Sequence, residues 1–331
     1  MGRWTLLTLL GLCASACGSN GGLPLGGTGG GGTGGATSGS GGTGNPLPMD
    51  SGTAAEAAQD LPSSVNMDAA DTSPSGGTGG SGGAIAGDGG PSAPCPGGAL
   101  LCDDFEKYAT AADLTAAWKP VVSGATMVVD DTKGWKGGKS LHIKGPTGTP
   151  SAVIVKDGAP LFPIAGNVMY GRVMMFLTGT PGGGYHWNSI QAAGVIPTSN
   201  LWGKYGWGGQ SGKVLAGYTV RQTAAGSVMM DCSKPSAMAF PDQKWVCVEW
   251  AFDGIKNQMH MWLDGTLLAD ADINGMGTRC VNSGDIGKPW AGPTFSNLTI
   301  GWQQYQVSSG PLELWLDELV VDKVRVGCPA P

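Results

Sequence analysis

Hydrophobic and polar residues alternate along two neighbouring stretches in the C-terminal half of the chain. In residues 244–252 every second side chain is Val, Trp or Phe, and in residues 258–263 every second side chain is Met or Leu. A period of two predicts β-strands with one buried and one exposed face. An Asp-Gly pair follows each run and favours a tight turn, because both residues tolerate positive φ. These stretches therefore predict two long, successive strands.

Similar strand-like runs recur through the same region, separated by Gly, Pro, Asn and Asp. One short helix is expected over residues 111–118. Many strands with few helices predict an all-β fold, a jelly-roll sandwich of two antiparallel sheets. The other predicted strands are 126–130, 140–144, 152–156, 168–177, 186–193, 214–221, 228–232, 298–302 and 312–321.

The first 16 residues predict a secretory signal peptide. Arg3 precedes a leucine-rich run that is too short to span a bilayer, and small residues occupy positions 14–16. Cys17 follows directly, as in the lipobox of bacterial lipoproteins. We therefore predict cleavage before Cys17 and its lipidation. Ordinary cleavage after Ala16, without a lipid, is the alternative.

Residues 17–94 are predicted to form a disordered tether. Between Gly18 and Pro94, 25 of the 77 residues are glycine and none is Phe, Trp or Tyr. Such a segment cannot bury enough apolar area to offset the entropy lost on ordering. Gly-rich scaling gives it a reach of about 50 Å. We expect an exported lipoprotein of the outer membrane or cell surface that contacts the membrane only through its lipid, or a secreted protein if Cys17 is unmodified.

Residues 95–331 have the length of one all-β domain. They hold 11 of the 12 tryptophans, 18 of the 19 basic residues and 19 of the 25 acidic residues, which gives a net charge of −1. A nearly neutral domain offers no support for nucleic-acid binding, which needs a basic patch. We expect a monomer without a nucleic-acid partner.

Six cysteines lie in this domain, and an even number in an exported chain predicts disulfides. Zinc binding is the rival interpretation, but no pair has the Cys-x-x-Cys spacing. Pairing of the first and last strands would bring the cysteines at the two ends together. The expected partners are Cys95 or Cys102 for Cys328, and Cys247 or Cys280 for Cys232.

Several short motifs of this domain resemble those of one known family. They are CDDFE (102–106), GGKSLHIKG (137–145), WLDG (262–265), LTIGWQQY (298–305) and LELWLDELVVD (312–322). Among concanavalin A-like jelly rolls, they are most similar to the core domain of the fungal cellulose-induced protein family, which is related to glucuronan lyases and more distantly to alginate lyases. The resemblance covers nearly all of residues 95–328 and implies the concanavalin A-like fold.

The same resemblance implies a structural calcium site. Jelly rolls of this type share a calcium ion between a Glu near the first strand and an Asp in the last, with backbone carbonyls from a loop. Here those positions are Glu106, Asp317 and the backbone near Ser140. Calcium prefers such oxygen ligands. Two solvated carboxylates at strand ends are the alternative.

The exposed face of one sheet is expected to form a groove for an extended sugar chain. If Ile190 faces the core, then Trp187, Ser189 and Gln191 face the groove. On residues 298–305, Gln303 and Tyr305 face out by the same alternation. The Gly-rich run 205–213 leaves Gln210 and Lys213 near the edge of the groove, and Trp207 is expected to stack on a sugar ring.

The lyases named above cleave uronic-acid polymers by β-elimination, and the resemblance to them suggests roles for the groove residues. Amides must neutralise the carboxylate, a base must take a proton, and an acid must protonate the leaving oxygen. We assign the first role to Gln191 and Gln210, with Asn188 as a further candidate. His186 is the candidate base, although a structural role is open to it. Tyr305 is the candidate acid, or both acid and base.

The leading hypothesis is a surface-tethered jelly roll that contacts polysaccharide, with possible lyase activity on uronic-acid polymers. A noncatalytic carbohydrate-binding or cell-envelope module is the alternative. Retaining glycoside hydrolysis needs two close carboxylates, and no strand offers them on one face. Residues 95–331 also lack the Gly-x-Ser-x-Gly sequence of a nucleophile elbow.

Overall fold

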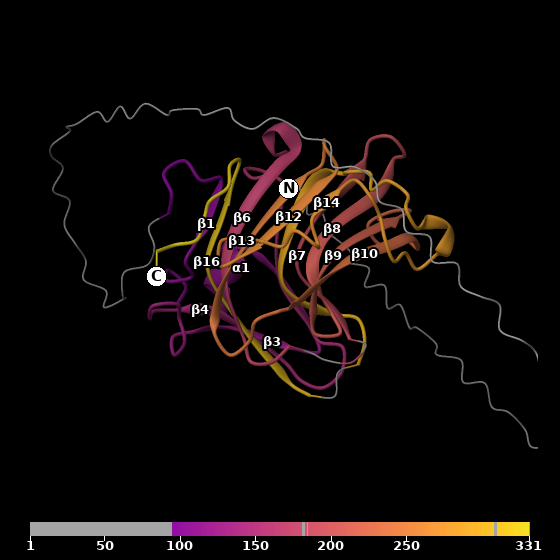
Figure 1. Ribbon diagram of the computed structural model, residues 1–331. Helices are drawn as coiled ribbons and strands as arrows, with labels where there is room; N and C mark the ends of the chain where they lie inside the picture. The colour runs from indigo at the N-terminus through magenta and orange to yellow at the C-terminus, as the bar shows by residue number, and fades with distance from the viewer. Residues whose placement is uncertain (1–94, 181–182, 184, 308–309, 331) are drawn as a thin grey trace, which may run out of the picture. The chain divides into compact units, whose positions relative to one another are not determined.

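The computed structural model describes residues 95–180, 183, 185–307 and 310–330. The predicted signal peptide, Cys17 and the tether lie outside the described residues. The described chain forms two antiparallel β-sheets that pack face to face as a jelly-roll sandwich, as predicted (Figure 1). Among the described residues, no helix is long and apolar enough to cross a membrane.

One sheet contains nine strands and carries both ends of the described chain. The strands predicted from the alternating pattern, β11 and β12, are adjacent in it, with Val248 opposite Leu263. Its order is β13 (Thr266–Leu267), β12 (Gln258–Leu263), β11 (Trp245–Asp253), β6 (Val168–Leu177), β16 (Leu312–Asp322), β4 (Ser140–Gly145) and β3 (Thr126–Asp130), with β1 (Leu101–Asp103) paired to β16 and β14 (Ile273–Asn274) paired to β12.

The other sheet contains seven strands, and its outer face is the face turned away from the first sheet. Helical segments are short: α1 (Ala111–Ala117) begins at a Thr110–Asp113 capping box, and η1 (Ala165–Asn167) and η2 (Ser283–Asp285) are 3₁₀ turns. The order of this sheet is β10 (Val228–Ala239), β9 (Lys213–Arg221), β8 (Leu201–Gln210), β7 (His186–Ile196), β15 (Thr294–Gln304), β5 (Ser151–Asp157) and β2 (Lys119–Ser123).

Strand β8 was not predicted from the sequence. Glycines occupy positions 203, 206, 208 and 209, and glycine is unfavourable in strand interiors. The strand forms because β7 and β9 pair with it on both sides along its whole length. Tertiary pairing therefore overrides the local preference at the centre of the sheet.

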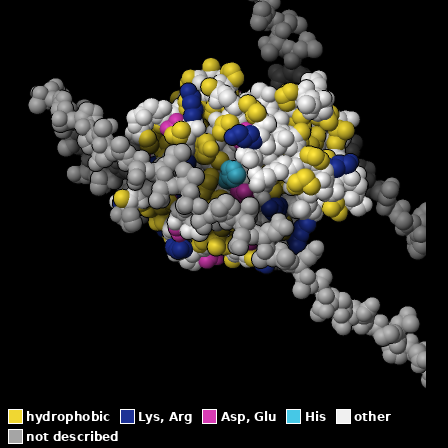
Figure 2. All heavy atoms as spheres, turned by 45° about the horizontal axis from the view of Figure 1, so that its top comes forward, with side chains coloured by type: hydrophobic (Ala, Val, Ile, Leu, Met, Phe, Trp, Pro, Cys, Tyr) yellow, Lys and Arg dark blue, Asp and Glu magenta, His cyan; other side chains and the backbone are white. Residues whose placement is uncertain are grey.

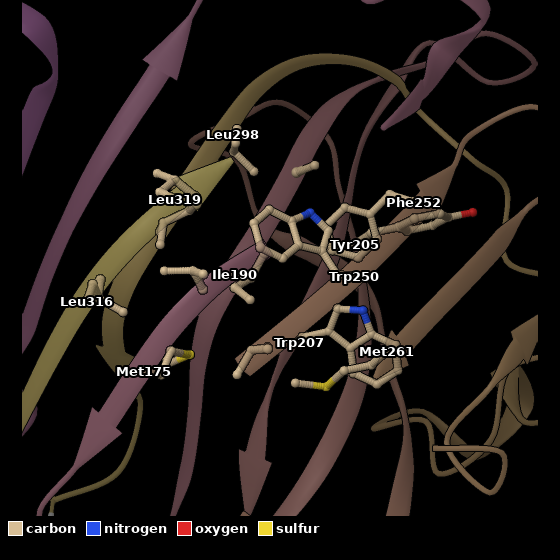
Figure 3. Packing of buried hydrophobic residues seen from close by; sticks show 14 of the residues in the cluster. Met175, Ile190, Tyr205, Trp207, Trp250, Phe252, Met261, Leu298, Leu316 and Leu319 are labelled. Atoms are coloured by element: carbon tan, nitrogen blue, oxygen red, sulfur yellow. The ribbon is translucent and has the colours of Figure 1, made fainter. Parts of the chain in front are cut away.

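Aromatic side chains fill the space between the sheets. Trp250 from β11 and Tyr205 and Trp207 from β8 are all fully buried and lie together with Met261 from β12 (Figure 3). Gly171 on β6 lets the Trp250 ring approach, since a Cβ at that position would overlap the indole. The core thus depends on alternate residues of facing strands pointing inward, as the period of two predicts.

The outside of the domain has a mixed character. On the face shown in Figure 2, hydrophobic side chains lie in small groups among polar atoms and scattered charged side chains. Scattered apolar residues of this kind are normal for a folded domain. The candidate sites are therefore the hollows on the outer face of the seven-stranded sheet.

All six cysteines of the domain form disulfides, which settles the choice between disulfides and zinc. Cys232 bonds to Cys280, one of its two expected partners. The expectation for Cys328 was wrong, because this residue bonds to Cys247 on β11. Cys95 and Cys102 bond to each other across a separation of 7 residues. The C-terminal segment leaves β16 and crosses β6 to reach β11, and a strand order of this kind cannot be read from spacing.

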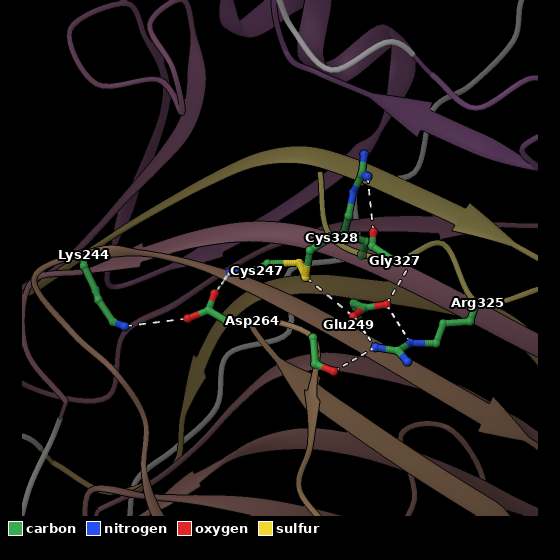
Figure 4. Close-up of a disulfide and its surroundings, with 9 residues drawn as sticks. Lys244, Cys247, Glu249, Asp264, Arg325, Gly327 and Cys328 are labelled. Carbon is green, nitrogen blue, oxygen red and sulfur yellow. Dashed lines mark hydrogen bonds and ion pairs between the residues drawn. A yellow bond between two sulfur atoms is a disulfide. The ribbon is translucent and has the colours of Figure 1, made fainter. Parts of the chain in front are cut away.

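An ion pair between a buried carboxylate and an exposed guanidinium lies beside the Cys247–Cys328 bond (Figure 4). The Glu249 carboxylate is 1% exposed and accepts hydrogen bonds from Arg325 Nε at 2.9 Å and Nη2 at 2.7 Å. The backbone N–H of Gly327 donates to the same carboxylate at 3.0 Å. The C-terminal segment is therefore held on the outer side of the nine-stranded sheet by a covalent bond and a bidentate ion pair.

We predict that removing the Cys247–Cys328 bond costs more stability than removing the Cys95–Cys102 bond. The first closes a loop of 81 residues and the second a loop of 7. Chain-entropy scaling gives about 4 kcal/mol for the longer loop and about 2 kcal/mol for the shorter one. Urea unfolding of the two double Cys→Ser variants measures the difference. Equal losses in the two variants would contradict the prediction.

Candidate functional site

A β-bulge on β7 sets which side chains reach the outer face of the seven-stranded sheet. The pairing of β7 with β8 shifts between Asn188 and Ile190, which leaves Ser189 as an extra residue opposite β8. Opposite β15 the register shifts at the same place, but there the extra residue lies on β15, between Ile300 and Gln303. Trp187 and Ile190 consequently both point into the core. Asn188 and Gln191 point outward, because the extra residue inverts the alternation between them.

Three sequence predictions are wrong here, those for Trp187 and Ser189 because of the bulge, and that for Trp207 because β8 was not recognised as a strand. Trp187 is 1% exposed and stacks on Trp302 with ring centroids 4.5 Å apart, so it cannot face a groove. Trp207 is fully buried opposite Ile190 and cannot stack on a sugar. Ser189 is buried within the bulge. A regular strand was assumed, and one inserted residue reverses every assignment on its far side.

Glycines on β8 make room for the bulge. A Cβ at Gly208 would overlap the carbonyl oxygen of Trp187, and a Cβ at Gly209 would come within 2.5 Å of the Trp187 ring. At Gly206 the nearest atom would be 3.4 Å away, on Gln191, which is an ordinary contact. Gly208 and Gly209 are therefore required by close packing, whereas a side chain at Gly206 would fit with ordinary contacts on the outer face.

Tyr305 lies at the centre of a polar network on this face. Its hydroxyl accepts hydrogen bonds from Asn188 Nδ2 at 2.9 Å and Lys204 Nζ at 3.2 Å. It donates to Gln303 Oε1 at 2.8 Å, and Gln191 Nε2 donates to the same oxygen at 3.1 Å. Four of the predicted site residues are thus brought together, with Lys204 as an addition.

His186 also faces outward, because it lies before the bulge. Its ring centroid is 5.1 Å from that of Tyr305, and its Nε2 is buried without a partner among the described residues. Burial lowers the pKa of the imidazole, nearby Lys204 adds to this effect, and Asp231 opposes it. His186 is therefore biased toward the neutral form, which can accept a proton. Asn188 Oδ1 is likewise buried without a partner there.

Two hollows lie next to each other on this face. The first, here called the charged cavity, has a volume of about 220 Å³, and the second, here called the long cavity, about 410 Å³. Lys204 and Arg221 line both, so the hollows are continuous. The charged cavity is also lined by His186, Asn188, Thr219, Val228, Asp231, Tyr305 and Gln306, and the long cavity by Val121, Ser151, Val153, Val155, Gln191, Ala193, Trp202, Ala224, Asn297, Thr299 and Gln303.

Gln210 and Lys213 stand apart from this network. Gln210 lies opposite His186 on β8, and Lys213 faces it across the β8–β9 turn. Neither side chain lines the charged cavity or the long cavity. The structure therefore does not bring these two residues to the Tyr305 network.

Sequence reasoning missed several charged and aromatic residues of the site. Lys204 and Trp202 were overlooked because β8 was not recognised as a strand. Had Tyr205 been placed in the core, alternation would have turned both of them outward. Arg221 and Asp231, on β9 and β10, carry no local signal that would link them to β7.

The predicted cation ligands converge on one loop. Glu106 Oε1 accepts the backbone N–H of Lys139 at 2.7 Å, and Asp317 Oδ2 accepts that of Trp135 at 2.8 Å. Ser140 is fully buried, and its hydroxyl donates to the carbonyl of Lys133 at 2.8 Å. Burial raises the pKa of Asp317 to about 8, and the carboxylates of Glu318 and Glu106 add to this effect. The two predicted carboxylates thus hold the same loop, although they lie far apart in sequence.

No family model matches the chain, and no curated protein does. Cellulose induced protein, Cip1, is similar at 19% identity over 69% of this chain and 100% of that chain, with a TM-score of 0.46. The binding domain of botulinum neurotoxin DC in complex with rat synaptotagmin II is 12% identical over 63% of this chain and 44% of that one, with a TM-score of 0.37. A sialidase is 11% identical over 68% of this chain and 19% of its own, with a TM-score of 0.38.

We predict that Gly208→Ala destabilises the domain whereas Gly206→Ala leaves it nearly unchanged. The first places a methyl group against the backbone of the bulge, and overpacking of this kind costs about 1–3 kcal/mol. The second places it two residues away on the same face, where its nearest neighbours, on Gln191 and Asn188, are at ordinary contact distances of 3.4–3.6 Å. Midpoints of urea unfolding compare the pair. An unchanged unfolding midpoint for Gly208→Ala would contradict the prediction, because it would mean that the bulge can accommodate a methyl group.

Proposed function

We propose that this domain binds an acidic polysaccharide along the outer face of the seven-stranded sheet. The observation that carries the proposal is the meeting of Lys204 and Arg221 with the amides of Asn188 and Gln191 around the Tyr305 hydroxyl. Two cations suit a carboxylate, and amides suit sugar hydroxyls as donors and acceptors. The two continuous hollows suit an extended chain more than a small molecule.

The same residues support β-elimination on a uronate as the activity of this site. His186 or Tyr305 takes the C5 proton, the electron pair forms the C4–C5 double bond, and the C4–O bond breaks. Tyr305 returns a proton to the leaving oxygen. Lys204 and Arg221, with the Asn188 and Gln191 amides, stabilise the charge that develops on the carboxylate. A neutral imidazole and a phenol 5.1 Å apart by ring centroids suit these roles.

The three disulfides are typical of exported proteins. We propose that the domain works at the outer membrane or cell surface, tethered through a lipid on Cys17. The lipid anchor stays a prediction, because Cys17 lies outside the described residues. A secreted form is the alternative.

We also propose one structural calcium ion between Glu106, Asp317 and backbone carbonyls near Ser140. The loop 133–140 is held at one end by Asp317 and at the other by Glu106. The Asp317 carboxylate is 2% exposed, and a divalent cation would offset its charge. Carboxylate and carbonyl oxygens are the ligands that calcium prefers, so the residues present fit the ion.

Binding is tested with polyglucuronate, alginate and a glucuronate-containing heteropolysaccharide, each against a neutral glucan. We expect the domain to retain at least one acidic polymer on an affinity gel, less strongly at high salt. The double variant Lys204→Gln, Arg221→Gln is expected to lose about tenfold or more in affinity, as for two charged contacts. Lys244→Gln, on the other sheet, is the matched control. Unchanged retention of the double variant would contradict the proposal.

The same incubations report lyase activity through the ultraviolet absorbance of the unsaturated uronide product. Tyr305→Phe is expected to retain polymer and to lose product formation by about 100-fold or more, the usual contribution of a general acid or base. Persistent binding without any product from the wild-type domain would leave the noncatalytic carbohydrate-binding module as the function.

For calcium, we expect the thermal midpoint to rise by roughly 5–10 °C when saturating calcium replaces a chelator. Ligand at 100 times its Kd adds about 2.7 kcal/mol of stability, and each kcal/mol shifts a domain of this size by about 2–4 °C. Asp317→Asn is expected to lose the shift, whereas Asp322→Asn on the same strand keeps it. A calcium shift that survives Asp317→Asn would overturn the assignment.

A further inference from the structure

The charged side chains that line the two hollows lie at one end of them. Lys204, Arg221 and Asp231 line the charged cavity beside His186. Lys204 and Arg221 also line the long cavity, and its other eleven lining residues are uncharged. The site therefore has a charged end and an uncharged remainder.

The uncharged remainder crosses four strands. From Lys204 on β8 the lining passes over Ala193 on β7, Thr299 on β15, Val155 on β5 and Val121 on β2. Neighbouring strands lie about 4.8 Å apart, so a group bound over β5 is about 14 Å from β8. This distance exceeds the screening length of about 8 Å at physiological ionic strength. The two cations therefore stabilise a carboxylate over β8 but not one over β5.

The basic residues of the far strands are already engaged. Lys119 on β2 pairs with Asp157 at 3.3 Å, and Lys156 on β5 donates to the carbonyl of Ala117. Among the described residues, the far end therefore offers no unpaired cation to a second carboxylate.

The chemistry of the far end suits uncharged sugars instead. Val121, Val153 and Val155 present methyl groups to the long cavity, and Val121 is 47% exposed. Gln303 and Asn297 lie beside them as hydrogen-bonding partners for hydroxyl groups. Apolar side chains next to uncharged polar ones suit sugars, which present C–H groups to the former and hydroxyl groups to the latter.

We infer that the ligand is a mixed polysaccharide in which a single uronate sits over Lys204 and Arg221 and uncharged sugars extend across β7 to β2. A homopolymer of uronate would place further carboxylates over the valines. This inference rests on the proposed function and narrows it to heteropolysaccharides with isolated uronates.

The test is calorimetric titration of the described domain with defined tetrasaccharides. The ligands are tetraglucuronate, a neutral tetrahexose and two mixed tetrasaccharides. Each mixed form has three neutral hexoses and a single glucuronate, which is at the reducing end in one form and at the non-reducing end in the other. We expect one mixed form to bind about tenfold more tightly than tetraglucuronate, a difference of about 1.4 kcal/mol. If no acidic ligand binds, the proposed function itself fails. If tetraglucuronate binds as well as or better than both mixed forms, only the present inference is overturned.

A gain-of-function pair tests the same inference without relying on lost binding. Val121→Lys places a cation at the far end and is expected to raise the affinity for tetraglucuronate about threefold, the size of one exposed ion pair. Val122→Lys is the matched control, because Val122 is 45% exposed on the same strand and lies opposite core-facing Ala152. Equal effects of the two substitutions, or a gain for the neutral tetrahexose, would contradict the inference.

Discussion

The layer of aromatic side chains between the two sheets is the constraint on which the outer face depends. Trp187 and Ile190 both reach this layer, and a regular strand could not send both inward across two intervening residues. Burying a tryptophan contributes about 4–6 kcal/mol. A bulge that leaves the Ser189 hydroxyl without a partner among the described residues costs about 1–3 kcal/mol. The free energy gained by burying Trp187 exceeds the cost of the unpaired Ser189 hydroxyl, so the strand adopts the bulge.

The bulge in turn assembles the candidate site. It turns His186 and Asn188 outward, next to Tyr305. A regular strand would instead have placed Trp187 beside Tyr305. Gly208 and Gly209 on β8 accept the displaced backbone. The outer face therefore owes its polar network to a packing requirement on the other side of the same strand, and the site is positioned by central strands rather than by loops.

Parts of this arrangement were accessible from the sequence. Gln191, Gln303 and Tyr305 were placed on the outer face by alternation within their own strands, and the structure confirms their orientation. Trp187 and Trp207 were misplaced, since a bulge and an unrecognised Gly-rich strand leave no clear local pattern. Lys204, Arg221 and Asp231 were missed because they join the site only through the pairing of β7 with β8, β9 and β10.

The sequence by itself determined the all-β class, the positions of most strands and the presence of disulfides, because these follow from side-chain periodicity and composition. Only the tertiary structure decided that Cys328 bonds to Cys247, that the alternation reverses at Ser189, and that two cations stand at one end of a largely uncharged groove. Strand order and register arise from contacts between segments distant in the chain. A local pattern of hydrophobic and polar residues specifies which face of a strand is buried, but not which strand lies beside it.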